Sequence, residues 1–130
     1  MKNQSTPTYK ITAICEPPRD HELSLNDYQQ AAISTAIYPH DHEIPYLALA
    51  LGEECGEVAG KVKKVIRDKN GQFFQTDINA LALELGDVLW YAANLANTLG
   101  FKLSDIARLN INKINSRLER GTLHGQGDNR

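Results

Sequence analysis

The chain has 130 residues, a formal net charge of −2, 42% hydrophobic residues and 23% charged residues. This balance is typical of one soluble globular domain, and it excludes the strongly basic surface with which proteins bind nucleic acids or membranes. No apolar run approaches the length of a membrane span, and Met1–Glu16 lacks the apolar core of a secretory signal. Cys15 and Cys55 are too few for a disulfide framework and are interpreted as free thiols in a reducing cytoplasm.

The chain begins with a polar segment, residues 1–23, which carries three prolines and no sustained period. It is predicted to be an N-terminal arm. Ser24 is a candidate N-cap, and Asp27 at the third helical position suits the positive end of the helix dipole. A first helix is therefore predicted to run to about Ile37, followed by a loop over residues 38–44.

The second helix is predicted from Pro45, which suits a first helical turn, to about Arg67. Its apolar residues recur at spacings of three or four and form one stripe. The stripe consists of Leu47, Leu51, Val58, Val62 and Val65. At position 54 the pattern requires an apolar side chain, but the residue is Glu54. Because a charged group is costly to bury unless it is paired or bound to a metal, Glu54 indicates either a surface irregularity or a site.

Two further helices are predicted over residues 77–99 and 104–119, each followed by a glycine, as is typical of helix ends. Thr76 or Asp77 can cap the first of them, and Ser104 can cap the second. Their predicted apolar stripes are Ile78, Leu81, Leu85, Val88, Ala92, Leu95 and Leu99, and then Ala107, Ile111, Ile114 and Leu118.

The order of these elements predicts the fold class. Four helices with short connections, and no strand-like alternation, predict an all-α fold whose protomer is a four-helix bundle. The helical domain is expected over residues 24–120, and residues 121–130 are expected to form a polar tail.

Acidic residues have the same spacing on the second and third helices. Glu54 and Glu57 are three residues apart, as are Glu84 and Asp87, so each pair lies on one helix face. If the two pairs face each other, four carboxylates form an oxygen-rich site for a hard divalent cation. Carboxylate ligands favour Mg²⁺ or Mn²⁺ over Zn²⁺, and no Glu-x-x-His motif supports a di-iron bundle. The alternative is a solvated acidic face, which the repulsion between like charges disfavours.

Mg²⁺ on carboxylates usually acts with substrate phosphates, and the fourth helix offers cations for them. Lys113 and Arg117 are four residues apart, with Asn110 on the same side; the alternative is an ordinary exposed basic face. Tyr91 shares the face of Glu84 and is a candidate to stack on a base, the alternative being a core or subunit contact. No glycine-rich phosphate-binding motif is present.

The acid motifs carry a family resemblance. Glu53-Glu54-Cys55-Gly56-Glu57 followed by Glu84-Leu85-Gly86-Asp87 resembles the E-E-x-x-E … E-x-x-D signature of MazG-like nucleoside triphosphate pyrophosphohydrolases. The resemblance covers about residues 23–130 and includes Asn26-Asp27-Tyr28-Gln29, Leu51-Gly52-Glu53, Val62-Lys63-Lys64, Asn110-Ile111-Asn112-Lys113 with Arg117, and Gly127-Asp128-Asn129-Arg130. It implies an all-α fold, bound Mg²⁺ and cleavage of nucleoside triphosphates to monophosphate and pyrophosphate. By position it makes Glu54, Glu57, Glu84 and Asp87 the metal ligands.

We therefore expect Mg²⁺-dependent hydrolysis of nucleoside triphosphates, either dNTPs or non-standard NTPs, with Mn²⁺ as the alternative ion. Glu53, next to the ligands, is the candidate catalytic residue that orients the attacking water. Tyr91, Asn110, Lys113 and Arg117 are the candidate substrate-binding residues. Two alternatives stay open: a non-catalytic helical interaction module, and a metal-dependent phosphohydrolase that acts on another phosphate ester.

The third helix predicts self-association. Val88, Leu89, Trp90 and Ala93 place apolar surface on more than one of its sides. A single layer of four helices can hardly cover so wide an arc, so a second copy is expected to cover it. Closed two-fold assembly is the commonest solution, and we expect a homodimer or homotetramer with no nucleic-acid or membrane partner.

Overall fold

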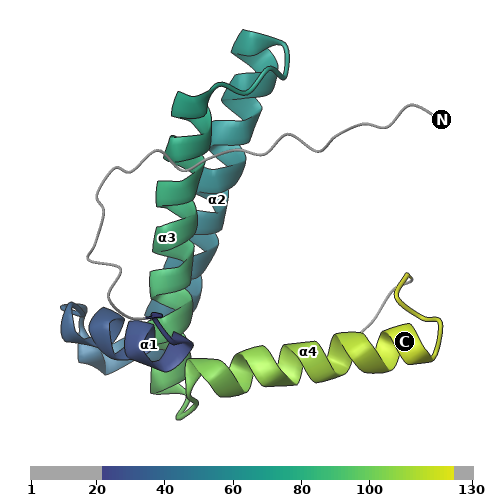
Figure 1. Ribbon diagram of the computed structural model, residues 1–130. Coiled ribbons are helices and arrows are strands. Elements are labelled where there is room, and N and C mark those ends of the chain that lie inside the picture. Colours follow the sequence, from purple (N-terminus) through teal and green to yellow (C-terminus); the bar gives the residue numbers. More distant parts are fainter. Residues whose placement is uncertain (1–21, 125–130) are drawn as a thin grey trace. The chain divides into compact units, whose positions relative to one another are not determined.

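The computed structural model describes residues 22–124. Within this range the chain forms four α-helices and one short 3-10 helix and no strand, which confirms the predicted all-α class (Figure 1). The helices are α1 (Leu25–Ser34), η1 (His40–His42), α2 (Glu43–Lys69), α3 (Gln75–Thr98) and α4 (Leu103–Glu119). Apart from Glu22 and Leu23, the predicted N-terminal arm lies outside the described residues, and the predicted tail is described only as far as His124. None of these helices is long and apolar enough to cross a bilayer.

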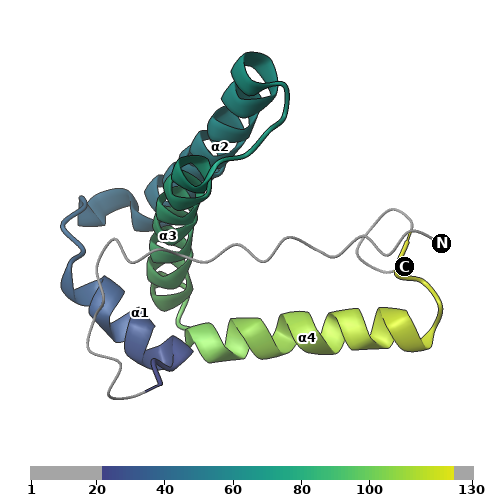
Figure 2. The same cartoon turned by 45° about the horizontal axis from the view of Figure 1, so that its top comes forward.

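The described chain forms two compact units, one of Pro45–Ala92 and one of Leu23–Ile44 with the chain from Ala93 onward. The first unit is an antiparallel hairpin in which α2 and α3 lie side by side (Figures 1 and 2). Asn70 and Gly71, with φ of 52° and 75°, provide the left-handed conformations that end α2 and start the turn.

The loop end of the hairpin is held by Asp77, on the first turn of α3. Its Oδ2 accepts a hydrogen bond from the Phe74 backbone N–H at 3.0 Å, which satisfies a group that the helix itself leaves unpaired. Its Oδ1 lies 2.5 Å from Lys69 Nζ at the end of α2. The predicted N-caps Thr76 and Asp77 are wrong, because α3 already begins at Gln75, and Asp77 contributes from inside the first turn by accepting from the Phe74 N–H.

The second unit is organised around Gln29 of α1, whose side chain is only 3% exposed. Its Nε2 donates to the carbonyl oxygens of Ala93 at 3.2 Å and Phe101 at 3.0 Å, and its Oε1 accepts from the Leu103 N–H at 2.9 Å. Three hydrogen bonds from one side chain thus fix α1 to the end of α3 and to the start of α4, against which it lies in Figures 1 and 2.

The predicted cap of α4 is wrong. The N-cap residue is Lys102, whose side chain accepts no hydrogen bond, and Ser104 lies inside the helix. The helix is capped from α1 instead, because Asn26 Oδ1 accepts from the Ser104 N–H at 3.2 Å and Gln29 accepts from the preceding residue. The exposed N–H groups of a helix start need acceptors, and here they come from distant side chains.

Other boundaries also differ from the prediction, by two residues or fewer at the end of α2 and at both ends of α3 and by more at the end of α1. α1 ends at Ser34 and not at Ile37. At this end the hydroxyls of Ser34 and Thr35 donate hydrogen bonds to the carbonyl oxygens of Ala31 and Ala32. α2 begins at Glu43, whose carboxylate contacts His40 of η1, so the predicted loop over residues 38–44 is partly helical. Pro45 is the third residue of α2 and still lies in the first turn, where its missing N–H is not needed.

Several residues of the predicted apolar stripes are exposed in the single chain. Leu85 of α3 is 61% exposed, and Ile111, Ile114 and Leu118 of α4 are 56%, 44% and 60% exposed. The helical period correctly gives their shared faces, but the partner surface is not supplied by the described part of this chain.

Candidate metal site

Three of the four predicted acidic ligands come together across the α2–α3 hairpin. One carboxylate oxygen each from Glu54 of α2 and from Glu84 and Asp87 of α3 lie within 4.8 Å of one another. Glu54 is carried there by the apolar stripe of α2, whose residues Leu47 and Val65 are buried at 0% and 4% exposure. The carboxylate therefore occupies a position on the contact face of α2 and is only partly exposed.

The electrostatics of the cluster favour a cation. The pKa of Glu54 is raised by burial first, and then by the negative charges of Asp87, Glu53, Glu84 and Glu57. Ionised carboxylates this close repel one another, and a divalent cation replaces the repulsion with attraction. The donor atoms are all carboxylate oxygens, which favours Mg²⁺ or Mn²⁺ over Zn²⁺.

The other two acids of the first motif lie on α2 beside this group. Glu57, one turn after Glu54, is exposed, and its charge acts on both Glu54 and Lys61. Glu53 is exposed and acts on Glu54 and Tyr91. The ligand role of Glu57 and the water-orienting role of Glu53 stay predictions.

Lys61 is a member of this site that the sequence interpretation missed. Its Nζ lies 2.9 Å from Glu84 Oε1, and this ion pair raises the pKa of Lys61. The side chain of Glu84 is only 17% exposed, so the pair is partly shielded from water. The signal was present in the sequence: Lys61 follows Glu54 by seven residues and Glu57 by four, which puts all three on one face of α2.

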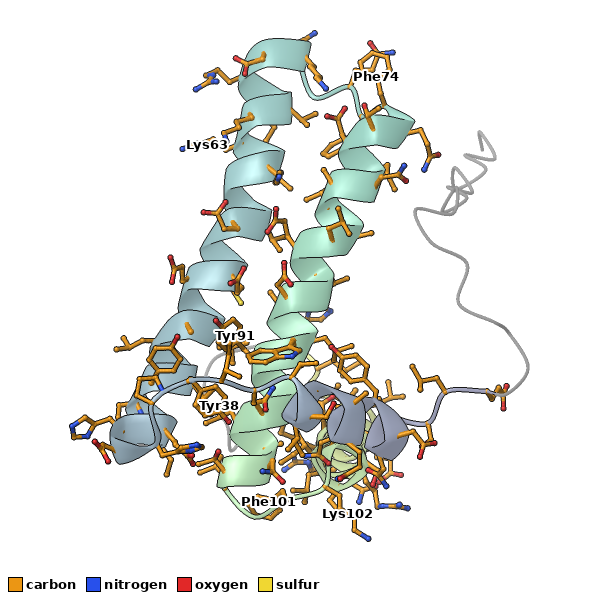
Figure 3. The ribbon with its side chains drawn as sticks, turned by 90° about the vertical axis from the view of Figure 1, so that its left-hand side faces the viewer. Tyr38, Lys63, Phe74, Tyr91, Phe101 and Lys102 are labelled. Atoms are coloured by element: carbon orange, nitrogen blue, oxygen red, sulfur yellow. The ribbon has the colours of Figure 1, made fainter. Side chains whose placement is uncertain are left out.

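Tyr91 lies one turn after Asp87, on the acidic face of α3, as predicted. Its pKa is raised by burial first, then by Tyr46, with which its hydroxyl is hydrogen-bonded, and by the charges of Glu54 and Glu53. The ring of Trp90 meets that of Tyr91 edge-on, with centroids 4.8 Å apart at 82°. Figure 3 shows Tyr91 toward one end of the hairpin, and Lys63 and Phe74 toward the other.

The remaining predicted substrate contacts belong to the second unit. Asn110 and Lys113 are exposed on α4, whereas Arg117 in its last turn is only 8% exposed. Their contact with substrate stays a prediction.

Comparison with known proteins supports the interpretation of the acid cluster. The model of the MazG nucleotide pyrophosphohydrolase domain matches residues 43–121, which contain both acid motifs. The Gene 37 protein of Mycobacterium phage L5 is 47% identical over 114 residues, which are 83% of this chain and 100% of that protein. No solved structure matches the chain. The match covers more than half of the chain, and the chain therefore belongs to the family of MazG nucleotide pyrophosphohydrolase domains.

Proposed function

We propose that this protein is a Mg²⁺-dependent nucleoside triphosphate pyrophosphohydrolase. The observation that carries the proposal is the convergence of Glu54, Glu84 and Asp87 within 4.8 Å, inside a MazG domain. Three carboxylates this close, of which Glu54 and Glu84 are partly removed from water and Asp87 is exposed, are an unfavourable arrangement unless a cation offsets their charge, and nucleoside triphosphates are substrates whose charge such a cation complements.

The reaction joins the oxygen of one water molecule to the α-phosphorus and breaks the bond from that phosphorus to the oxygen bridging to the β-phosphorus. The products are a nucleoside monophosphate and pyrophosphate, and the proton of the water passes to a base or to solvent. When bound, Mg²⁺ supplies neutralisation of phosphate charge and polarisation of the phosphoryl group.

The residues of the chain have separate parts in this proposal. Glu54, Glu84 and Asp87, with Glu57, hold the ion, and Mn²⁺ is the alternative ion for the same oxygen donors. Glu53 orients the attacking water and accepts its proton, which suits an exposed carboxylate next to the ligands.

The nucleoside lies against Tyr91, whose ring borders the acidic face of α3. Asn110, Lys113 and Arg117 contact phosphate oxygens, and a homodimer or homotetramer covers the apolar surface of α3 and α4. The substrates are dNTPs or non-standard NTPs.

The test is a panel of nucleoside triphosphates incubated with Mg²⁺ and with EDTA, with the products separated by ion exchange. Pyrophosphate together with monophosphate, formed only with Mg²⁺, supports the proposal. Orthophosphate as the first product favours a phosphohydrolase that acts on another phosphate ester. An absence of turnover and of nucleotide binding favours a non-catalytic helical interaction module.

A further inference from the structure

Three kinds of polar group follow one another along the α2–α3 hairpin. Tyr46 and Tyr91 are hydrogen-bonded near the open end of the hairpin, and the acid cluster lies in its middle. Beyond the cluster, toward the connecting loop, the facing side chains of α2 change from acidic to basic, beginning with Lys61. Figure 3 shows the same direction, with Tyr91 on one side of the hairpin's middle and Phe74 on the other.

A pocket lies on the loop side of the acid cluster. It has a volume of about 140 Å³, and its lining combines three lysines (Lys61, Lys64 and Lys69), two acids (Asp68 and Asp77) and the apolar side chains of Val65, Ala80 and Leu81. Because one water needs only about 10–15 Å³ of such space, the pocket has room for a phosphate group with its remaining water. Lys61 joins the two sites, since it lines the pocket while its Nζ lies 2.9 Å from Glu84.

The charge of this pocket is positive once its internal ion pairs are taken into account. The two acids at its edge are already matched: Asp68 is held by the Arg67 guanidinium at 2.6 and 2.7 Å, and Asp77 by Lys69 at 2.5 Å. Among the described residues, no ion pair is found for Lys64. The pKa of Asp68 is lowered first by Arg67, which already holds that carboxylate, and also by the charge of Lys64. Lys61 and Lys69, by contrast, each form an ion pair of their own. Lys64 is therefore the lysine of the pocket without an ion pair among the described residues.

We propose that Lys64, together with Lys61, binds the β- and γ-phosphates of the substrate and the pyrophosphate that leaves. This inference rests on the proposed function, and it gives the substrate a direction: nucleoside toward Tyr91, α-phosphorus at the acid cluster, terminal phosphates in the lysine pocket.

The chemistry of the leaving group agrees with this direction. Negative charge grows on pyrophosphate as the bond to the α-phosphorus breaks, and ammonium groups placed beside it stabilise that charge. Lysine binds phosphate as a compact point charge, and a charged hydrogen bond is stronger than a neutral one. Acids alone at the metal site would repel the terminal phosphates, so cations on their far side serve the same reaction.

The test compares Lys64→Met with Lys63→Met. Methionine keeps much of the side-chain volume without the charge, and Lys63 is the adjacent residue, which does not line the pocket and points away from α3 in Figure 3. Titration calorimetry with Mg²⁺ measures the binding of pyrophosphate, of a non-hydrolysable α,β-imido triphosphate, and of the monophosphate.

We expect Lys64→Met to weaken binding of pyrophosphate and of the triphosphate analogue about tenfold or more, as loss of a charged hydrogen bond does, and to leave monophosphate binding unchanged. Lys63→Met binds all three as the wild type does. Unchanged pyrophosphate binding in Lys64→Met, or an equal loss of monophosphate binding, overturns the inference.

Lys61→Met supplies a second readout. Because Lys61 also contacts Glu84, this variant is expected to weaken pyrophosphate binding and to change the Mg²⁺ concentration needed for half-maximal turnover. A wild type that hydrolyses triphosphates, with lysine variants that bind pyrophosphate normally, refutes the phosphate pocket alone. A wild type that neither binds nor hydrolyses triphosphates refutes the proposed function and this inference with it.

Discussion

Replacement of Glu54 by glutamine is expected to have opposite effects on stability without and with Mg²⁺. In EDTA the variant loses a charge that lies within 4.8 Å of two other carboxylates. At that separation two unit charges repel by about 0.9 kcal/mol at the dielectric constant of water, and the Lys61 pair already offsets part of the Glu84 charge. We therefore expect Glu54→Gln to raise the free energy of unfolding by roughly 1 kcal/mol in EDTA.

With Mg²⁺ the wild type is expected to have the higher free energy of unfolding. An ion that binds only the folded wild type stabilises it by about 2.7 kcal/mol at a concentration one hundred times its dissociation constant, and the variant gains much less. Urea unfolding followed by circular dichroism, with and without millimolar Mg²⁺, measures both the stability gained by the variant in EDTA and the stabilisation of the wild type by Mg²⁺. Glu119→Gln, an exposed charge change on α4, is the matched control and should respond to neither condition.

The pH dependence gives this experiment a further check. Because the pKa of Glu54 is raised above its ordinary 4.5, ionisation of Glu54 costs folding free energy. The cost is absent below the unfolded value, where the group is protonated in both states, and it grows as pH rises through the folded pKa. The advantage of Glu54→Gln in EDTA should accordingly vanish in acid. A variant that is less stable than wild type in EDTA at neutral pH, or one that Mg²⁺ stabilises equally, would refute the reasoning.

Further predictions address the ligands, the second unit and assembly. Asp87→Asn or Glu57→Gln should abolish Mg²⁺-dependent turnover without loss of helical content by circular dichroism, and full activity in either variant excludes a four-acid site. Gln29→Leu breaks three hydrogen bonds and leaves the Leu103 N–H without its acceptor, so urea unfolding should show a free energy of unfolding lower by about 2–4 kcal/mol. A decrease below about 0.5 kcal/mol contradicts the conclusion that Gln29 holds α1 to α3 and α4. Light scattering at micromolar concentration should give at least twice the 14.5 kDa of one chain, and a monomeric mass in an active preparation would show self-association to be wrong.

The parts of the fold that the sequence predicts correctly depend on residues close together in the chain. Ser24 caps α1 through the Asp27 N–H, three residues away, so both partners can be read from one short segment. Gly100, with φ of 81°, follows α3 in the same way. The cap of α4 could not be predicted, because its acceptors Asn26 and Gln29 come from α1, more than seventy residues earlier.

The residues of the candidate site can be divided in the same way, into those identifiable from neighbouring residues of the chain and those that depend on distant ones. Glu54 was identifiable because it interrupts an apolar stripe on its own helix, and the spacing of Glu84 and Asp87 indicates a second acidic face. The pairing of Lys61 with Glu84 was not predictable, since it depends on the axial register between two antiparallel helices. That register is a property of their packing, and the period of either helix alone does not contain it.

The register also explains why the acids can be held together. Apolar contacts of α2 lie on both sides of the cluster, with Leu47 toward the open end and Val65 toward the loop, and both side chains are buried. They keep the helices together where the carboxylates would otherwise push them apart, and Lys61 offsets part of the charge between them. A single ion that bridges α2 and α3 would remove the remaining repulsion. The carboxylates that weaken the hairpin without a cation are thus the groups through which a cation stabilises it, and this is why metal binding, stability and the proposed catalysis should respond together to the replacement of Glu54.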